Sequence, residues 1–152
     1  MYMLKNNIVI LIILFIFFQI SFVSSEEKFL SLKKEKINVR YGPGFDFPVK
    51  YVYKKINLPV KQIDKKENFR RIIDLKNNSG WIHVSQLKKS NSIIVLENKI
   101  LFKRPSNLSK PTAQIEKGRL LIINKCENDW CNVNTDNYSG WVKIINVWGY
   151  VK

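Results

Sequence analysis

The chain has 152 residues, and 26 Lys and Arg against 12 Asp and Glu give it a formal net charge of +14. The basic residues are scattered without a run of five or six like charges, which argues against a nucleic-acid-binding tail, and we expect no nucleic-acid partner. One histidine and two cysteines are too few for the four ligands that zinc prefers, so we expect no metal and no cofactor.

The positive charge has two interpretations. Lysine supplies most of the basic residues in a chain that is also rich in Ile and Asn, a composition typical of an AT-rich genome. The same charge would attract anionic partners, such as phosphate-bearing lipid or cell-wall polymer, at low salt. We favour the compositional origin and keep peripheral contact with an anionic membrane surface as an expectation.

Residues 1–25 have the pattern of a secretory signal peptide. Lys5 precedes an unbroken apolar run, Ile8–Phe18, and small residues lead to an exit at Ser25. A short positive start, an apolar centre and small residues at the exit are typical of a cleaved signal. An uncleaved membrane anchor is the alternative, although Ile8–Val23 is shorter than the ~20 residues that a spanning helix needs. We expect export, with anchoring only if cleavage fails.

The remainder of the chain is predicted to be all-β. Beyond the signal, no window longer than a dozen residues keeps apolar side chains at helical spacing. Short β-rich runs separated by turn residues instead indicate small barrels or sandwiches. The predicted strands are Ile37–Arg40, Val49–Tyr53, Leu58–Ile63, Phe69–Leu75, Gly80–Val84, Ser92–Leu96, Ile100–Phe102, Ala113–Ile115, Leu120–Asn124, Trp130–Asn134 and Gly140–Ile144.

An internal repeat runs through these strands. The pattern Asn-x-Ser-Gly-Trp-aliphatic occurs at Asn77–Ile82 and again at Asn137–Val142, and three further anchors follow in the same order. Such a period predicts two tandem modules of about sixty residues each. We place the first at residues 26–90 and the second at residues 91–152. The short connection between them has no flexible Gly/Ser tract, so we expect the modules to lie against each other.

The Ser-Gly-Trp steps are predicted to lie where a hairpin turn ends and a strand begins. Glycine allows a close backbone approach, and tryptophan then supplies the largest apolar surface available to a small barrel. We interpret these positions as structural rather than as a ligand platform. The predicted structural residues are Gly80, Trp81, Gly140, Trp141 and, at the start of a strand in the second module, Trp130.

The motifs of the first module, taken together, resemble the bacterial SH3-like domain. They are Asn38-Val39-Arg40, Gly42-Pro43-Gly44, Phe47-Pro48-Val49, Asn57-Leu58-Pro59-Val60 and Gly80-Trp81-Ile82. The resemblance covers roughly Lys33–Tyr150, with Asn57 where glycine is usual and Phe69 where tryptophan is common. The second copy is similar but has Arg104-Pro105-Ser106 in place of the Gly-Pro-Gly loop. The resemblance implies tandem small five- to seven-stranded barrels that are exported and usually non-catalytic, and that bind envelope material such as peptidoglycan.

The two cysteines, Cys126 and Cys131, are predicted to form a disulfide. An even count in an exported chain favours pairing, and a hairpin turn at Asn128-Asp129 would bring the two onto paired strands. Cell-wall cysteine peptidases often carry this type of module, but their chemistry needs a free thiolate beside an imidazole. Here the thiols are expected to be paired and His83 lies in the other module, so we expect no enzymatic activity.

Aromatic residues gather around the Gly-Pro-Gly loop of the first module. Beside a rigid loop, such residues could form a groove for a sugar ring or an extended peptide, although the strand residues could equally complete the core. Tyr41 and Phe45 are the best exposed candidates, with Arg40 available for an anionic group. The full set of predicted ligand-binding residues is Arg40, Tyr41, Phe45, Tyr51 and Tyr53.

These features predict an exported, non-catalytic binding or scaffolding protein of the bacterial cell envelope, monomeric and periplasmic. Its expected partner is cell-wall glycopeptide or an envelope protein. Two alternatives remain open: a basic adaptor that binds anionic lipid or a protein partner, and an accessory subunit of a separate wall hydrolase. The C-terminal stretch Asn146–Lys152 is predicted either to finish the second barrel as a strand or to pack between the modules.

Overall fold

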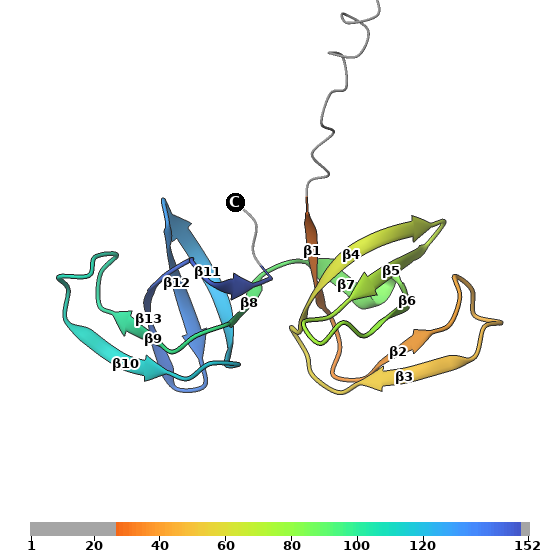
Figure 1. The fold of residues 1–152 in the computed structure, drawn as a ribbon, viewed down its shortest axis with the longest axis horizontal. Helices are drawn as coiled ribbons and strands as arrows, with labels where there is room; N and C mark the ends of the chain where they lie inside the picture. The colour runs from red at the N-terminus through yellow and green to blue at the C-terminus, as the bar shows by residue number, and fades with distance from the viewer. Residues whose placement is uncertain (1–26, 150–152) are drawn as a thin grey trace, which may run out of the picture.

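The computed structural model describes residues 27–149, and its strands form two seven-stranded antiparallel sheets joined by a short connection (Figure 1). The predicted signal peptide lies outside the described residues. The first sheet holds β1 (Lys28–Leu32), β2 (Ile37–Arg40), β3 (Val49–Tyr53), β4 (Pro59–Lys66), β5 (Phe69–Ile73), β6 (Ser79–His83) and β7 (Leu87–Lys89). The second holds β8 (Ser92–Val95), β9 (Lys99–Phe102), β10 (Pro111–Ile115), β11 (Leu120–Glu127), β12 (Trp130–Thr135), β13 (Tyr138–Lys143) and β14 (Val147–Trp148).

The two sheets have the same topology. The strand order is β3-β2-β6-β5-β4-β1-β7 in the first and β10-β9-β13-β12-β11-β8-β14 in the second, so each strand has its counterpart seven strands later. A single 3₁₀ turn, η1 (Val84–Gln86), is the only helical element among residues 27–149. The predicted fold class, all-β with two tandem modules, is therefore confirmed.

Each module has its own apolar core. Equivalent buried positions carry similar side chains, as with Val60 and Leu121 at the start of β4 and β11. The first core contains Leu32, Ile37, Val39, Val60, Ile72, Ile82 and Leu87. The second contains Ile93, Val95, Leu101, Ile115, Leu121, Cys131, Val133 and Val142. The repeat in the sequence thus corresponds to two separately packed interiors.

The glycines of the Ser-Gly-Trp steps bring neighbouring strands together. A Cβ atom at Gly80 would lie 2.4 Å from Val39 Cγ1, and one at Gly140 would lie 3.0 Å from Leu101 Cβ. Because side chains alternate along a strand, the tryptophan that follows each glycine lies on the sheet face opposite the core. Trp141 is buried there beneath Lys125, whose Nζ is 5.1 Å from the ring centroid.

A chain of hydroxyl hydrogen bonds ties the two modules together. Ser92 Oγ donates to the Asn57 carbonyl at 2.5 Å and lies 2.8 Å from Ser31 Oγ, which accepts from the Asn91 N–H at 3.3 Å. Since the Ser92 proton is directed at Asn57, Ser31 donates to Ser92. Ser31 and Ser92 are both buried, so this contact replaces water between the modules.

Trp148 completes the contact from the C-terminal side. Strand β14 pairs with β8, and Figure 1 shows it close to the connection between the sheets. From there Trp148 Nε1 donates to the Pro59 carbonyl at 3.1 Å, and its indole lies edge-on to Phe29 at 5.0 Å. The two alternatives predicted for the C-terminal stretch both hold for its described part: Val147–Trp148 adds a strand to the second sheet, and Trp148 packs against the first module.

Candidate functional site

The loop between β2 and β3 carries the most exposed aromatic side chains of the first module. Tyr41 is 62% exposed and Phe45 is 65% exposed. Arg40, at the end of β2, holds the loop in place: its Nη1 donates to the carbonyls of Phe45 at 3.2 Å and Phe47 at 2.6 Å. A guanidinium group has five N–H donors, so Arg40 retains donors for a ligand.

Phe45 contacts two rings that the sequence did not indicate as part of the site, those of Phe69 and His83. Its ring centroid lies 5.2 Å from Phe69 and 5.1 Å from His83, and the Arg40 guanidinium carbon lies 5.6 Å from it. We name Arg40, Phe45, Phe69 and His83 the loop aromatic site. It presents one open aromatic face on a rigid base, the arrangement that stacks against a sugar ring or a peptide side chain.

His83 and Phe69 enter this site through strand pairing. They are directly opposite each other on β6 and β5, and their rings meet edge-on at 5.2 Å. His83 Nδ1 accepts from the Ser85 N–H at 3.3 Å and lies 2.8 Å from Ser85 Oγ, which places the ring proton on Nε2. Period-two alternation indicates the two strands, but it places Phe69 opposite His83 only once the register of their hairpin is known.

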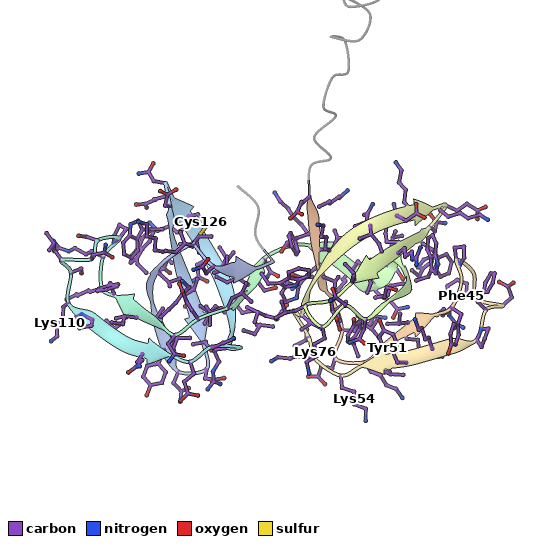
Figure 2. The ribbon with its side chains drawn as sticks, viewed as in Figure 1. Phe45, Tyr51, Lys54, Lys76, Lys110 and Cys126 are labelled. Atoms are coloured by element: carbon purple, nitrogen blue, oxygen red, sulfur yellow. A yellow bond between two sulfur atoms is a disulfide. The ribbon has the colours of Figure 1, made fainter. Side chains whose placement is uncertain are left out.

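Tyr51 and Tyr53 form a separate pair on β3. Both are half-buried against the first core, with ring centroids 5.2 Å apart and hydroxyl oxygens 3.4 Å apart. Figure 2 shows Phe45 at the outer end of the module and Tyr51 nearer its centre. No ring contact joins this pair to the loop aromatic site among the described residues. The structure therefore divides the predicted ligand-binding set into an exposed part and a half-buried part.

Tyr53 also anchors the turn that follows β5. Its hydroxyl donates to Asp74 Oδ2 at 3.0 Å, while Asp74 Oδ1 accepts from the N–H groups of Lys76 and Asn78, both at 2.9 Å. Burial raises the pKa of the Tyr53 phenol, and hydrogen bonding to Tyr51 and the Asp74 carboxylate raise it further. Tyr53 thus stays neutral and acts as a donor.

This raised pKa predicts a loss of stability in alkali. The unfolded chain releases the Tyr53 proton near the ordinary tyrosine pKa of about 10, whereas the folded chain keeps it, so stability is complete below that pH and falls above it. Thermal unfolding measured between about pH 8 and about pH 11 should show a steeper fall for the wild type than for Tyr53→Phe. Tyr138→Phe, at an exposed tyrosine, is the control. Parallel curves for all three proteins would contradict the prediction.

The second module has a different surface at the equivalent place. Trp130 occupies the position of Phe69 and packs edge-on against Phe102 at 5.7 Å, while its cross-strand partner is Lys143 instead of a histidine. In the loop after β9, the exposed apolar side chain is Leu108, not a phenylalanine. The open aromatic face is therefore a feature of the first module.

Cys126 and Cys131 are directly opposite each other on β11 and β12 and form a disulfide, as predicted. The hairpin turn between them contains Asn128 in the left-handed region, with a φ of 52°. Both sulfur atoms are engaged in this bond, and His83 belongs to the other module. Among residues 27–149 no group of three or more potential metal ligands occurs. The same residues contain no helix long and apolar enough to span a membrane.

Comparison with known proteins identifies one family, and similar solved structures include two NlpC proteins. The family model described as bacterial SH3 domain matches residues 33–89 and again residues 97–149. The structure of NlpC2 from Trichomonas vaginalis is similar at 11% identity and a TM-score of 0.37 over 80% of this chain and 47% of that one. NlpC1 from the same organism is similar at 11% identity and a TM-score of 0.38 over 84% and 47%. The chain thus spans less than half of either structure. No curated protein matches.

Proposed function

The chain belongs to the bacterial SH3 domain family, and on this basis we propose that it is an exported, non-catalytic binding or scaffolding protein of the cell envelope, located in the periplasm. Bacterial SH3 domains are cell-wall binding modules. The first module would carry out the recognition, with cell-wall glycopeptide as the ligand.

The observation that carries this proposal is the supported, open face of Phe45. An exposed phenylalanine is ordinarily free to move, but here the ring also contacts Phe69, His83 and Arg40, which restrict its motion. A pre-ordered aromatic face loses little conformational entropy on binding, which favours stacking against the apolar face of a sugar. Tyr41, at the start of the same loop, is a second exposed ring, and Lys50 Nζ lies 5.6 Å from its centroid. The remaining Arg40 donors suit the carboxylates of a stem peptide.

Retention on purified peptidoglycan across a salt series tests this function. Wild-type protein should remain bound at about 1 M salt, where the Debye length of about 3 Å screens exposed charges. Phe45→Ala should weaken binding by about tenfold, because it removes the central aromatic contact. Tyr138→Ala is the matched control, since Tyr138 is 58% exposed but lies in the second module.

Two results would contradict the proposal. Equal retention of Phe45→Ala and Tyr138→Ala would place recognition elsewhere. Release of soluble wall fragments by the purified protein would show that it is an enzyme.

A basic adaptor for anionic lipid is the second candidate. Four ion pairs occur among residues 27–149, so most of the lysines there have no acidic partner and keep their charge available. Binding of this kind would follow the screening curve and disappear at about 1 M salt for all variants alike. The same salt series therefore separates glycopeptide recognition from charge-driven association.

A further inference from the structure

A small pocket beside the core of the first module is lined by positive charge. Its volume is about 230 Å³, below the range of about 300–1,000 Å³ that is typical of drug-sized ligands, so it suits a small group. We name it the basic pocket. Strands β1, β5 and β7 each contribute cations to it, and these are Lys28, Arg70, Lys88 and Lys89. None of its lining residues is acidic.

Arg70 stands at a position that faces the core. Its cross-strand partner on β6 is Ile82, which is fully buried, and cross-strand partners lie on the same face of a sheet. The equivalent pair in the second module is Cys131 and Val142, both buried in the second core. The first module therefore places a guanidinium group where the second module has apolar packing and a disulfide.

Gln62 shows the same difference on the neighbouring strand. It lies opposite the core residue Ile72, and its equivalent in the second module, Ile123, packs against the second core. Its Oε1 is buried among protein atoms and has no hydrogen-bond partner among the described residues, so this acceptor does not face an occupant of the pocket. The charged groups at the pocket are therefore the cations alone.

The four cations have no acidic partner in the part of the chain that the structure describes. Arg70 Nη1 donates to the carbonyls of Glu67 and Phe69, both at 2.9 Å, which orients the guanidinium and leaves its other nitrogens available. Glu27, next to Lys28 along the chain, is paired with Lys61. Unpaired positive charges around one small pocket repel each other, and a bound anion would remove that repulsion.

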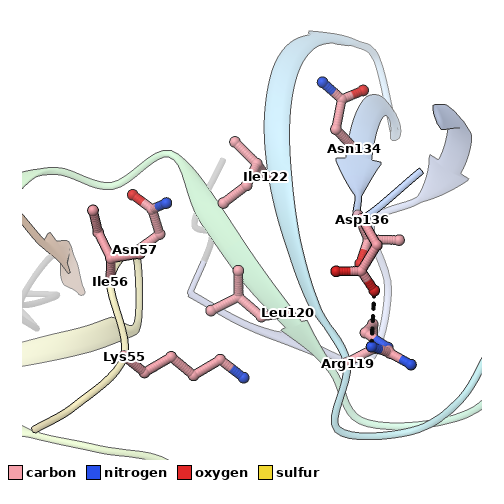
Figure 3. Close-up of a pocket in the computed structure, with 9 residues that line it drawn as sticks. Lys55, Ile56, Asn57, Arg119, Leu120, Ile122, Asn134 and Asp136 are labelled. Carbon is pink, nitrogen blue, oxygen red and sulfur yellow. Dashed lines mark hydrogen bonds and ion pairs between the residues drawn. The ribbon is translucent and has the colours of Figure 1, made fainter. Parts of the chain in front are cut away.

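The larger cleft between the modules differs in charge. Its volume is about 390 Å³, and its lining includes Arg119 paired with Asp136 at 3.1 Å (Figure 3). With Lys55 as the other cation, this lining carries one net positive charge, against four at the basic pocket. The basic pocket is therefore the stronger candidate for an anion.

We propose that the basic pocket binds a phosphate monoester, carried either by a small soluble molecule or by a lipid headgroup. A phosphate monoester has a charge of about −1.5 to −2 at neutral pH and three acceptor oxygens, so it can engage several cations at once. Leu30, Val84 and Leu87 line the rest of the pocket, where the carbon atoms of the ester would lie. This site goes beyond glycopeptide recognition, and it differs from association by net charge because particular cations form it.

An NMR titration with sn-glycerol 3-phosphate, in which glycerate is the carboxylate control, tests the site. At about 0.15 M salt the phosphate should shift the amide signals of Arg70, Lys88 and Lys89, and bind at least about fivefold more tightly than glycerate. Arg70→Gln and Lys89→Gln should each weaken binding by about tenfold, because each removes a charge-assisted hydrogen bond. Arg71→Gln and Lys54→Gln remove the same charges at exposed positions outside the pocket, and should bind within about twofold of the wild type.

Co-sedimentation with phosphatidylcholine vesicles that contain phosphatidic acid distinguishes the two sources of the phosphate. Vesicle binding that Arg70→Gln weakens and Arg71→Gln does not, without shifts from glycerol phosphate, would assign the site to a lipid. Shifts from glycerol phosphate without vesicle binding would assign it to a soluble ester. Phe45→Ala should behave as the wild type in both arms, so failure here is distinct from failure of glycopeptide recognition.

Three results would overturn the proposal. One is the absence of binding in both arms, up to about 10 mM of the soluble ester. Another is glycerate binding as tight as that of glycerol phosphate. The third is equal binding by the pocket variants and their controls, which would show that net charge alone is responsible.

Discussion

Replacing Gly80 with alanine is expected to lower the free energy of unfolding of the first module by about 3 kcal/mol. The added methyl group would lie 2.4 Å from Val39 Cγ1 and 3.0 Å from the Arg40 carbonyl oxygen. Val39 is fully buried in the core, so neither the side chain nor the backbone has room to move. The free energy of unfolding of a small domain is only about 5 kcal/mol, so the variant would lose most of it. A urea unfolding curve should show this as a large shift of the midpoint to lower urea concentration.

Gly118→Asn is the control for this change. No atom lies within 4 Å of a Cβ built at Gly118, and the equivalent residue of the first module is already Asn57, with a left-handed backbone. Asparagine tolerates the left-handed backbone better than most residues, so we expect this variant to lose only about 1 kcal/mol. If Gly80→Ala were as stable as Gly118→Asn, the close strand approach described for the Ser-Gly-Trp step would be wrong.

Leu121→Ala is expected to destabilise the second module by about 3–4 kcal/mol. Leu121 is 0% exposed and lies at the centre of the second core, so truncation removes apolar contacts and leaves a cavity. Ile100→Ala is the matched control in the same sheet. Ile100 is 47% exposed, so its truncation should lower the free energy of unfolding by only about 0.5 kcal/mol. Both can be measured by urea unfolding, and equal losses would contradict a separately packed second core.

The strands could largely be predicted from the sequence because their signals are local. Turn residues mark where the strands end, and period-two alternation marks the strands themselves. The repeat supports each predicted strand of the first module with an equivalent strand in the second. Strand β1 was missed because Ser31, at a buried position, breaks the apolar pattern. Its partner is Ser92, 61 residues away, and no local rule connects the two. Strand β7 was missed because three residues after a 3₁₀ turn give too short a pattern.

The candidate site could be predicted only in part. The exposure of Tyr41 and Phe45 follows from a loop that is rich in turn residues, and the sequence indicated it. The support beneath Phe45 depends on Phe69 and His83 facing each other across a hairpin, and this pairing becomes evident only when the register is known. The contact between Ser31 and Ser92 requires the relative placement of the two modules, which the sequence indicated only as close packing.

The loop aromatic site can be tested most directly by NMR with a soluble muropeptide added to the isotope-labelled protein. We expect chemical-shift changes concentrated at Tyr41, Phe45 and the loop they border, extending to Phe69 and His83. These changes should persist at about 0.5 M salt, because stacking is not screened. Shift changes confined to the second module, or none at all at millimolar muropeptide, would contradict recognition by the first module.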